Sequence, residues 1–455
     1  MKYKGFIVPP IISDFLIGRV WAEDQLPKQW QAIASQVPHY MHLLKKYGYV
    51  QQQQGIRQQP KQCMRCLTTL PRHLITYTLT YCRHCLMMGR VTSQTTLLTY
   101  HDNQYRFIKK NIAQYPQQLS EAQQRVSQAL ITSVKARQHH LVDAVCGAGK
   151  TEMLFPMLDY ALHKRYRICI ATPRADVVKE LMPRLQQAFP QRVIHALYGD
   201  APLSKGCAQI IIATTHQLYH FENAFDIMIV DEADAFPFTY DHTLQLAVTK
   251  AKKQDAPLIF VTATPSKTLL ALVKKEQWQH SKVWHRYHQH PLPVPRFSSL
   301  FHYQITFKKR LPRKLARWVQ ERLRCCEPFL IFFATKQLMT SSLIHFQQLD
   351  PLIESVHAHD PERTHKVQQL RDGQLKGLLT TTILERGITI PNIQIAVVGA
   401  EHTIFDASAL IQISGRAGRH PQYPTGDIVF FHHGVSVAMS KARQRIRMQN
   451  AYKEV

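Results

Sequence analysis

Residues 144–151 read Ala-Val-Cys-Gly-Ala-Gly-Lys-Thr, and residues 231–234 read Asp-Glu-Ala-Asp. The first stretch follows a predicted short strand, His140–Ala144, and precedes a segment with apolar residues on one helical face. The second follows the apolar run Ala224–Val230. A glycine-containing loop between a strand and a helix can turn its N–H groups toward phosphate oxygens. Together, the two stretches predict a magnesium–ATP site on an α/β fold.

The first stretch has the residues that a phosphate-binding loop needs. Gly147, Ala148 and Gly149 form the turn that faces the phosphates. Lys150 can reach the β- and γ-phosphates, and the hydroxyl of Thr151 can bind magnesium. Ala144 stands where such loops usually have their first glycine. A strand–helix turn without a ligand is the alternative for this stretch taken alone.

The second stretch supplies the acidic groups. Asp231 would hold the magnesium ion directly or through water, and Glu232 would act as general base toward the attacking water. Short acidic runs occur often by chance. The upstream phosphate loop makes the catalytic interpretation the stronger one.

Three further segments follow in order. Val261–Ser266 and Thr380–Thr389 each place hydroxyl groups after an apolar run, at the end of a predicted parallel strand where ligands collect. Residues 412–419 read Gln-Ile-Ser-Gly-Arg-Ala-Gly-Arg. If this segment is helical, Arg416 and Arg419 share one face and can clamp phosphate oxygens. A surface charge cluster is the alternative.

This ordered set resembles superfamily 2 helicases and translocases of the DEAD/DEAH type, whose ATP lies between two RecA-like lobes. The resemblance covers about Leu119 to Arg419. It implies that Arg416 and Arg419 are arginine fingers, that Gln412 is a helper contact, and that Gln123 contacts adenine.

The resemblance also implies roles for segments outside the nucleotide site. Thr262–Thr264 would couple hydrolysis to lobe movement. Ala171–Arg174 and Thr214–Thr215 would follow a nucleic-acid backbone. RNA helicases of the DEAD-box type normally have histidine where this chain has Gln412, which favours a DNA translocase.

Four cysteines predict a metal site in the N-terminal third. Cys63 and Cys66 form one C-x2-C pair, Cys82 and Cys85 form another, and fifteen residues separate the pairs. This spacing is typical of a structural zinc site with four thiolates. Alternating polar and apolar residues at 75–81 predict a strand pair between them, and hence a zinc ribbon.

The charge pattern predicts a polyanionic partner. The chain has 455 residues and a formal net charge of +26. Residues 1–110 alone hold fifteen Lys or Arg against four Asp or Glu. Basic residues in or near the cysteine pairs (Lys61, Arg65, Arg72 and Arg83), interleaved with Tyr77 and Tyr81, favour contact with single-stranded DNA. The alternative is a ribbon that braces the first lobe.

An N-terminal four-cysteine module before a helicase core resembles the late-competence DNA-uptake ATPase family (ComFA). The zinc cysteines of the replication-restart helicase lie instead within its second lobe. The resemblance implies an ATP-dependent single-stranded DNA translocase or helicase that drives DNA uptake during transformation, with ATP, Mg²⁺ and Zn²⁺. It also implies recruitment to uptake machinery at the cytoplasmic face of the inner membrane. The chain shows no signal peptide and no long apolar run, which favours the cytoplasm.

Alternatives to this function are a replication-restart-type DNA helicase, a DEAD-box RNA helicase and a non-enzymatic DNA-binding scaffold. A degenerate scaffold is expected to have lost at least one of the six side chains predicted to act on ATP, which are Lys150, Thr151, Asp231, Glu232, Arg416 and Arg419.

Composition predicts four regions within this α/β chain. Residues 1–110 form a basic N-terminal domain with a zinc ribbon at about 60–90, and 111–283 form the first RecA-like lobe. Residues 284–296 form a proline-rich linker, and 297–455 form the second lobe with a basic C-terminal helix. The run Gln51–Gln54 predicts a polar loop before the ribbon.

Overall fold

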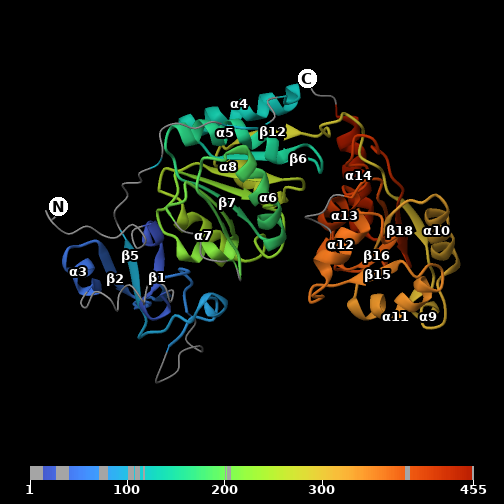
Figure 1. Cartoon of the computed structure of the whole chain (residues 1–455), viewed down its shortest axis with the longest axis horizontal. Helices are drawn as coiled ribbons and strands as arrows, with labels where there is room; N and C mark the ends of the chain where they lie inside the picture. The colour runs from blue at the N-terminus through green and yellow to red at the C-terminus, as the bar shows by residue number, and fades with distance from the viewer. Residues whose placement is uncertain are drawn as a thin grey trace. The chain divides into compact units, whose positions relative to one another are not determined.

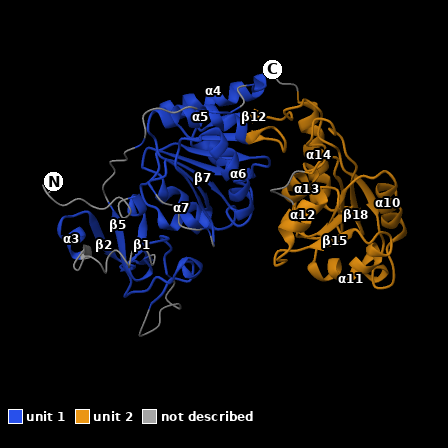
Figure 2. Ribbon diagram, viewed as in Figure 1, with its two compact units in different colours: residues 1–142, 151–281 blue, residues 143–150, 282–455 orange. Residues whose placement is uncertain are grey.

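The computed structural model describes residues 14–26, 40–70, 80–100, 107, 113–115, 118–199, 201, 206–384 and 390–452. Contacts divide the chain into two compact units (Figure 2). The first unit contains residues 1–142 and 151–281, and the second contains 143–150 and 282–455. The phosphate loop therefore groups with the second unit, although its strand and helix continue into the first.

A seven-stranded sheet forms the centre of the first unit, in the order β12-β6-β11-β10-β7-β9-β8. Strand β10 pairs in parallel with β11 and β7, and β9 pairs in parallel with β7 and β8. Strands β6, β7, β9 and β11 are buried at every residue, as expected of parallel strands covered on both faces. The strands are β6 (His140–Ala144), β7 (Ile168–Thr172), β8 (Ile194–Leu197), β9 (Ile210–Thr214), β10 (Ile227–Asp231), β11 (Leu258–Thr262) and β12 (Gln279–Val283).

Helices surround this sheet (Figure 1). They are α4 (Glu121–Ala136), α5 (Lys150–His163), α6 (Ala175–Ala188), α7 (His242–Ala251) and α8 (Lys267–Lys275), with the 3-10 helix η4 (Thr215–His220). The predicted apolar face of α5 is confirmed, because Met153, Leu154, Met157, Leu158, Ala161 and Leu162 are buried.

The N-terminal part of the first unit has a three-stranded antiparallel sheet in the order β1-β5-β2. Its strands are β1 (Val20–Ala22), β5 (Thr96–Tyr100) and β2 (Val50–Gln54), and helix α3 (Tyr40–Lys46) precedes β2. The hairpin of β3 (Ile56–Gln58) and β4 (Lys61–Cys63) leads into the first cysteine pair.

The loop predicted at Gln51–Gln54 is wrong, because these residues form most of β2. Backbone pairing with β5 holds the strand, while most of its glutamine side chains are exposed. Successive strand residues point to opposite faces, so the exposed Gln51 and Gln52 leave both faces partly solvated, and backbone pairing holds the strand in place of apolar burial.

A six-stranded sheet forms the centre of the second unit, and all five of its pairings are parallel. In sheet order the strands are β13 (Arg296–Ser299), β18 (Ile428–His432), β17 (Gln394–Val398), β14 (Phe329–Phe333), β16 (Gly377–Thr380) and β15 (Ile353–Val356). The helices are α9 (Tyr303–Thr306), α10 (Arg313–Arg324), α11 (Lys336–Gln347), α12 (Arg363–Arg371), α13 (Ala407–Ser414) and α14 (Val437–Ala451). Strand β14 is buried at every residue.

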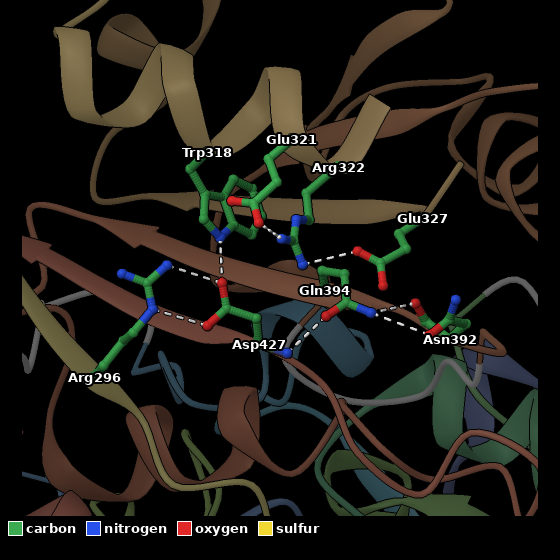
Figure 3. Close-up of polar contacts among 8 residues, drawn as sticks. All are labelled: Arg296, Trp318, Glu321, Arg322, Glu327, Asn392, Gln394 and Asp427. Carbon is green, nitrogen blue, oxygen red and sulfur yellow. Dashed lines mark hydrogen bonds and ion pairs between the residues drawn. The ribbon is translucent and has the colours of Figure 1, made fainter. Parts of the chain in front are cut away.

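Asp427 ties together one edge of the second sheet (Figure 3). Its two carboxylate oxygens accept hydrogen bonds of 2.9 Å from Nε and Nη2 of Arg296, and Oδ2 accepts one of 2.7 Å from Nε1 of Trp318. Its backbone N–H donates to Oε1 of Gln394 at 2.6 Å. Burial raises the pKa of Asp427, but these donors outweigh burial and leave the pKa below its usual value.

Two parallel-sheet units with a four-cysteine module in the N-terminal region confirm the predicted fold class. None of the helices in the described part of the chain has the length and apolar character needed to cross a bilayer. Several predictions fall outside the described residues: most of the strand pair at 75–81, the side chains of Arg72 and Tyr77, and residues 385–389 of the hydroxyl segment.

Candidate nucleotide and metal sites

The phosphate loop has the backbone form that its sequence predicts. It connects β6 to α5, and Lys150 is the first residue of the helix. Gly147 and Gly149 have φ angles of 85° and 74°, in the region that side chains avoid. Glycine at both positions lets the turn close at the start of a helix, where N–H groups attract an anion.

Within the second unit, the phosphate loop contacts the segment that carries the predicted arginine fingers. Sγ of Cys146 donates to Oε1 of Gln412 at 2.9 Å, and both side chains are buried. An ideal Cβ at Gly415 would lie 2.4 Å from Cβ of Cys146, so only glycine permits this approach. Gln412 was predicted to act at the nucleotide, and its contact with Cys146 was not predicted.

The two acids lie at the carboxyl end of β10, in the first unit. Oδ1 of Asp231 accepts a hydrogen bond of 2.9 Å from the N–H of Glu232. Glu232 has a left-handed φ of 56°, which few residues other than glycine adopt without strain. Strand β11 lies between β6 and β10, so its end separates the phosphate-loop strand from Asp231.

Asp234 joins the acidic stretch to the predicted coupling segment. Oγ1 of Thr262 donates to Oδ1 of Asp234 at 2.6 Å, and Oγ1 of Thr264 donates to Oδ2 at 2.5 Å. The Asp234 carboxylate therefore accepts hydrogen bonds from two hydroxyl groups at the end of β11. Asp234 belongs to the acidic stretch at 231–234, but no role was predicted for it, because only the fold brings it close to Thr262.

The helical arrangement predicted for Arg416 and Arg419 is wrong. Helix α13 ends at Ser414, and Gly418 has a φ of 66°, so the two arginines lie in the turns that follow the helix. Glycine at 415 and 418 interrupts the helix before the arginines can share a face. Arg416 is buried, and Nε of Arg419 donates to the carbonyl of Gly415 at 2.9 Å.

Gln123 has a structural role at the start of α4. Its Oε1 accepts from the N–H of Ser120 at 2.9 Å, and its own N–H donates to the hydroxyl of Ser120 at 3.3 Å. This reciprocal pair is a capping box. The Ser-x-x-Gln spacing was present in the sequence and could have been recognised. The contact with adenine stays a prediction.

The two segments predicted to follow a nucleic acid lie at the carboxyl ends of neighbouring strands of the first sheet. Thr172 and Thr214 end the adjacent parallel strands β7 and β9 and are paired in register. Val230 on the next strand is level with Ala171, which puts Asp231 at the same edge.

The four cysteines form a compact buried cluster. Their Sγ atoms all lie within 4.8 Å of one another, with Cys63 to Cys85 at 3.7 Å and Cys66 to Cys82 at 3.5 Å. Tetrahedral zinc with Zn–S bonds of about 2.3 Å needs sulfur–sulfur separations of roughly 3.8 Å. Four thiols and no other donor in the cluster fit a closed structural Zn²⁺ site.

Hydrogen bonds between the thiols polarise the cluster. Those with Cys63, then with Cys82 and Cys85, lower the pKa of Cys66, while thiol hydrogen bonds and burial raise the pKa of Cys63. Metal binding would have to displace the thiol protons, so it would depend on pH.

The predicted contact of Arg65 with DNA is wrong, because Arg65 does not lie on the surface. It is fully buried, with Nε 3.4 Å from Sγ of Cys85 and Nη2 3.0 Å from the Cys85 carbonyl. Nη2 also contacts the carbonyl of Gly89. The guanidinium faces the thiol cluster, where a cation can stabilise thiolates. Arg83, in contrast, is exposed.

The cysteine module and the first sheet share one hydrophobic core, which includes the four cysteines, Phe221 and Phe225. Nζ of Lys250 on α7 donates to the carbonyls of Arg65 at 2.5 Å and Tyr219 at 3.2 Å. Burial lowers the pKa of Lys250 to about 8, against the opposing effect of Glu222 and the cysteines.

The module also contacts η4, the helix that follows Thr214. The rings of Trp21 and His220 stack with centroids 4.1 Å apart, and Nε2 of Gln217 lies 3.9 Å from Sδ of Met88. The cysteine cluster is therefore packed beside the segment predicted to follow the nucleic-acid backbone.

Comparisons with known proteins identify the class. The family described as "Type III restriction enzyme, res subunit" matches residues 117–267, and the "Helicase conserved C-terminal domain" matches 313–421. The structure of S. cerevisiae Dbp5 bound to RNA and ADP BeF3 aligns with a TM-score of 0.56 over 74% of this chain and 89% of that chain. At 17% identity it shows the fold alone. The chain is a helicase-type protein with two RecA-like lobes.

The family follows from the N-terminal region and the full-length relatives. The "Competence protein ComFA N-terminal domain" matches residues 8–99. Competence protein ComFA of Bacillus subtilis (strain 168) is 40% identical over 89% of this chain and 89% of its own length. The protein of the same name from Streptococcus pneumoniae (strain ATCC BAA-255 / R6) is 35% identical over 95% of this chain and 97% of its own length. The chain belongs to the ComFA family of competence proteins.

Proposed function

We propose that this protein is an ATP-driven motor that moves single-stranded DNA during DNA uptake in natural transformation. The observation that carries the proposal is a phosphate loop and an Asp-Glu pair on RecA-like lobes in a member of the ComFA family. The high net positive charge supports a nucleic-acid partner.

The proposed nucleotide chemistry assigns a role to each side chain. Lys150 binds the β- and γ-phosphates, with the N–H groups of Gly147, Ala148 and Gly149 around them. Thr151 and Asp231 hold Mg²⁺, which neutralises charge on the phosphates when bound. Glu232 accepts the proton of the attacking water.

The second lobe contributes the remaining groups in this proposal. Arg416 and Arg419 stabilise the charge that develops on the transferred phosphoryl group, and Gln412 positions the nucleotide. Gln123 contacts adenine. The contact of Gln412 with Cys146 supports this assignment, because it connects the finger segment to the phosphate loop inside one unit.

Hydrolysis becomes movement through the hydroxyl contacts of Asp234. A change at Asp231 or Glu232 reaches Thr262 and Thr264 through that carboxylate. Asp231 itself ends β10, which lies between β11 and the strands β7 and β9 that end at Thr172 and Thr214. We propose that DNA follows this edge of the sheet. Recruitment of the motor to uptake machinery at the cytoplasmic face of the membrane belongs to the same proposal.

The test is ATP turnover by the purified full-length protein with single-stranded DNA, duplex DNA or RNA added separately, beside Lys150→Ala. We expect strong stimulation by single-stranded DNA and none in the variant. Preference for duplex DNA would favour a replication-restart type of helicase, and preference for RNA would favour an RNA helicase. Absence of ATP turnover with all three nucleic acids would leave a DNA-binding scaffold as the better explanation.

A further inference from the structure

Arg286 is a buried arginine in the segment between the two sheets, five residues before the first proline of the linker, Pro291. Only 1% of its surface is exposed. Its Nη2 donates to the carbonyl of Ala417 at 2.7 Å, and its Nη1 contacts the carbonyl of Gly418. The residue lies in the second unit with both of its partners.

These two carbonyls belong to the short turn between Arg416 and Arg419. Fixing them fixes the backbone that carries both predicted fingers. The neighbouring His288 adds a third contact, from Nε2 to the carbonyl of Gly418 at 3.1 Å. Burial and the charge of Arg286 lower the pKa of His288, so the ring is neutral at pH 7 and Nε2–H can donate.

The close approach depends on Gly418. Its φ is 66°, and an ideal Cβ there would lie 2.7 Å from Nη1 of Arg286 and 2.3 Å from the carbonyl oxygen of Pro424. A side chain at this position would displace the guanidinium. The turn is therefore built around Arg286.

The charge of Arg286 lacks a carboxylate partner among the described residues. Carbonyl oxygens occupy both Nη atoms, and Nε is buried without a hydrogen-bond acceptor. Burial and the nearby Arg419 lower the pKa of Arg286 to about 10, so the group is still charged at neutral pH. A buried cation without an anion is costly to the fold.

The position of Arg286 shows where an anion would compensate that cost. An ideal Cβ at Gly147 would lie 3.5 Å from Cγ of Arg286 and 3.7 Å from Nε. The N–H of Tyr287 donates to the carbonyl of Gly147 at 3.1 Å, and that of Val145 donates to Val283 at 2.9 Å. The chain that carries Arg286 therefore runs along the phosphate loop.

We propose that Arg286 is a positioning residue of the nucleotide site, which joins the phosphate loop to the Ala417–Gly418 turn and is stabilised by the phosphate anion on that loop. The inference rests on the proposed function, because it takes ATP as the anion. A bound nucleotide then stabilises the guanidinium, and the guanidinium holds the two fingers in place for the transition state.

Three full-length variants test the proposal: Arg286→Gln removes the charge, Arg286→Lys keeps it, and Arg310→Gln removes a charge from an exposed site in the same unit. We expect Arg286→Gln to lower kcat for single-stranded-DNA-stimulated hydrolysis about 100-fold, as loss of one charge-stabilising group does. KM for ATP should rise as well, because the guanidinium that pairs with the bound nucleotide is lost, and nucleotide-free DNA affinity should be unchanged. Arg286→Lys should recover part of kcat, and Arg310→Gln should match wild type.

Thermal unfolding with and without ADP separates this role from a purely structural one. The wild type should gain several degrees from saturating ADP. Arg286→Gln should lose most of that gain, and Arg286→Lys should retain it. An equal fall in Tm with and without ADP, or a wild-type kcat in Arg286→Gln, would overturn the proposal.

The two hypotheses fail differently. If the wild type hydrolyses no ATP with any nucleic acid, the proposed function fails, while the ADP-dependent Tm of Arg286→Gln still decides the role of Arg286. If the wild type gains no stability from ADP, the phosphate anion is not the partner of Arg286, and the inference fails.

Discussion

The cysteine cluster and the nucleotide site differ in how their residues are distributed over the fold. All four cysteines lie in the first unit, buried, with sulfur atoms already at the spacing of a tetrahedral ion. The residues proposed to act on the nucleotide are divided: Asp231 and Glu232 belong to the first unit, and Gly147, Lys150 and Arg416 belong to the second.

This difference matches the tasks of the two sites. A structural metal site is most stable when one unit closes it completely. For the proposed motor, residues in separate units would allow nucleotide binding and release to be coupled to movement. Removing a residue from the closed site should therefore affect folding, and removing one from the divided site should affect turnover.

Loss of zinc should give the largest effect. Cys63→Ser leaves three thiols buried in the core that the module shares with the first sheet, so we expect zinc loss and unfolding of the first unit. Structural zinc contributes on the order of 10 kcal/mol in small zinc domains. Elemental analysis and thermal unfolding measure both effects, with Cys325→Ser, an exposed cysteine, as the control. Unchanged zinc content in Cys63→Ser would contradict the predicted zinc site.

Lys150→Ala should have the next largest effect, confined to turnover. Loss of the ammonium should lower kcat by about 10²- to 10³-fold, the range for removal of one group that stabilises transition-state charge. The Tm without nucleotide and the affinity for single-stranded DNA should match wild type. Equal loss of DNA binding and turnover would mean a folding defect and would end the contrast between the two sites.

Asp234→Asn sharpens the comparison inside the first unit. An amide keeps the shape of the carboxylate but not its charge, so the hydroxyls of Thr262 and Thr264 lose a charged acceptor, and a hydrogen bond to a charged group contributes about 1.5–3 kcal/mol. We expect stimulation by DNA to fall about tenfold while basal ATPase activity changes little. A variant in which both rates fall together would show that Asp234 acts on chemistry and not on coupling.

The smallest effect should come from Asp427 and concern the second unit alone. Its lowered pKa means that it stabilises the folded state above the unfolded-state value of about 4, and this contribution is lost as pH falls through the lower folded value. Asp427→Asn should cost about 1–2 kcal/mol at pH 7, reduced because Arg296 is half exposed. The difference in unfolding free energy from wild type should narrow below pH 4. A constant difference would contradict the role given to the carboxylate.

The sequence predicted the local structure of short backbone motifs well. The phosphate loop, the acids at the end of β10 and the cysteine spacing each place their residues with few long-range contacts. The sequence predicted poorly where burial decided the outcome. Arg65 looked like a surface cation until Cys85 and Gly89 enclosed it, and the glutamines of β2 looked like a loop because their pairing partner lies over forty residues away.

Arg416 and Arg419 show a third kind of difference. Their spacing was interpreted with helical geometry, but Gly415 and Gly418 end the helix, and buried Arg286 organises the turn instead. No local pattern connects residue 286 with residues 417 and 418. Such contacts become visible only when the strands on either side are placed.

Glu232 shows what selection for activity can leave in a fold. Its φ of 56° suits glycine, and a glycine there would relieve about 1 kcal/mol of backbone strain. It would also remove the proposed proton acceptor. The strained conformation is thus a trade-off between stability and activity. The chain retains a locally unfavourable residue at the point where the proposed chemistry needs a carboxylate.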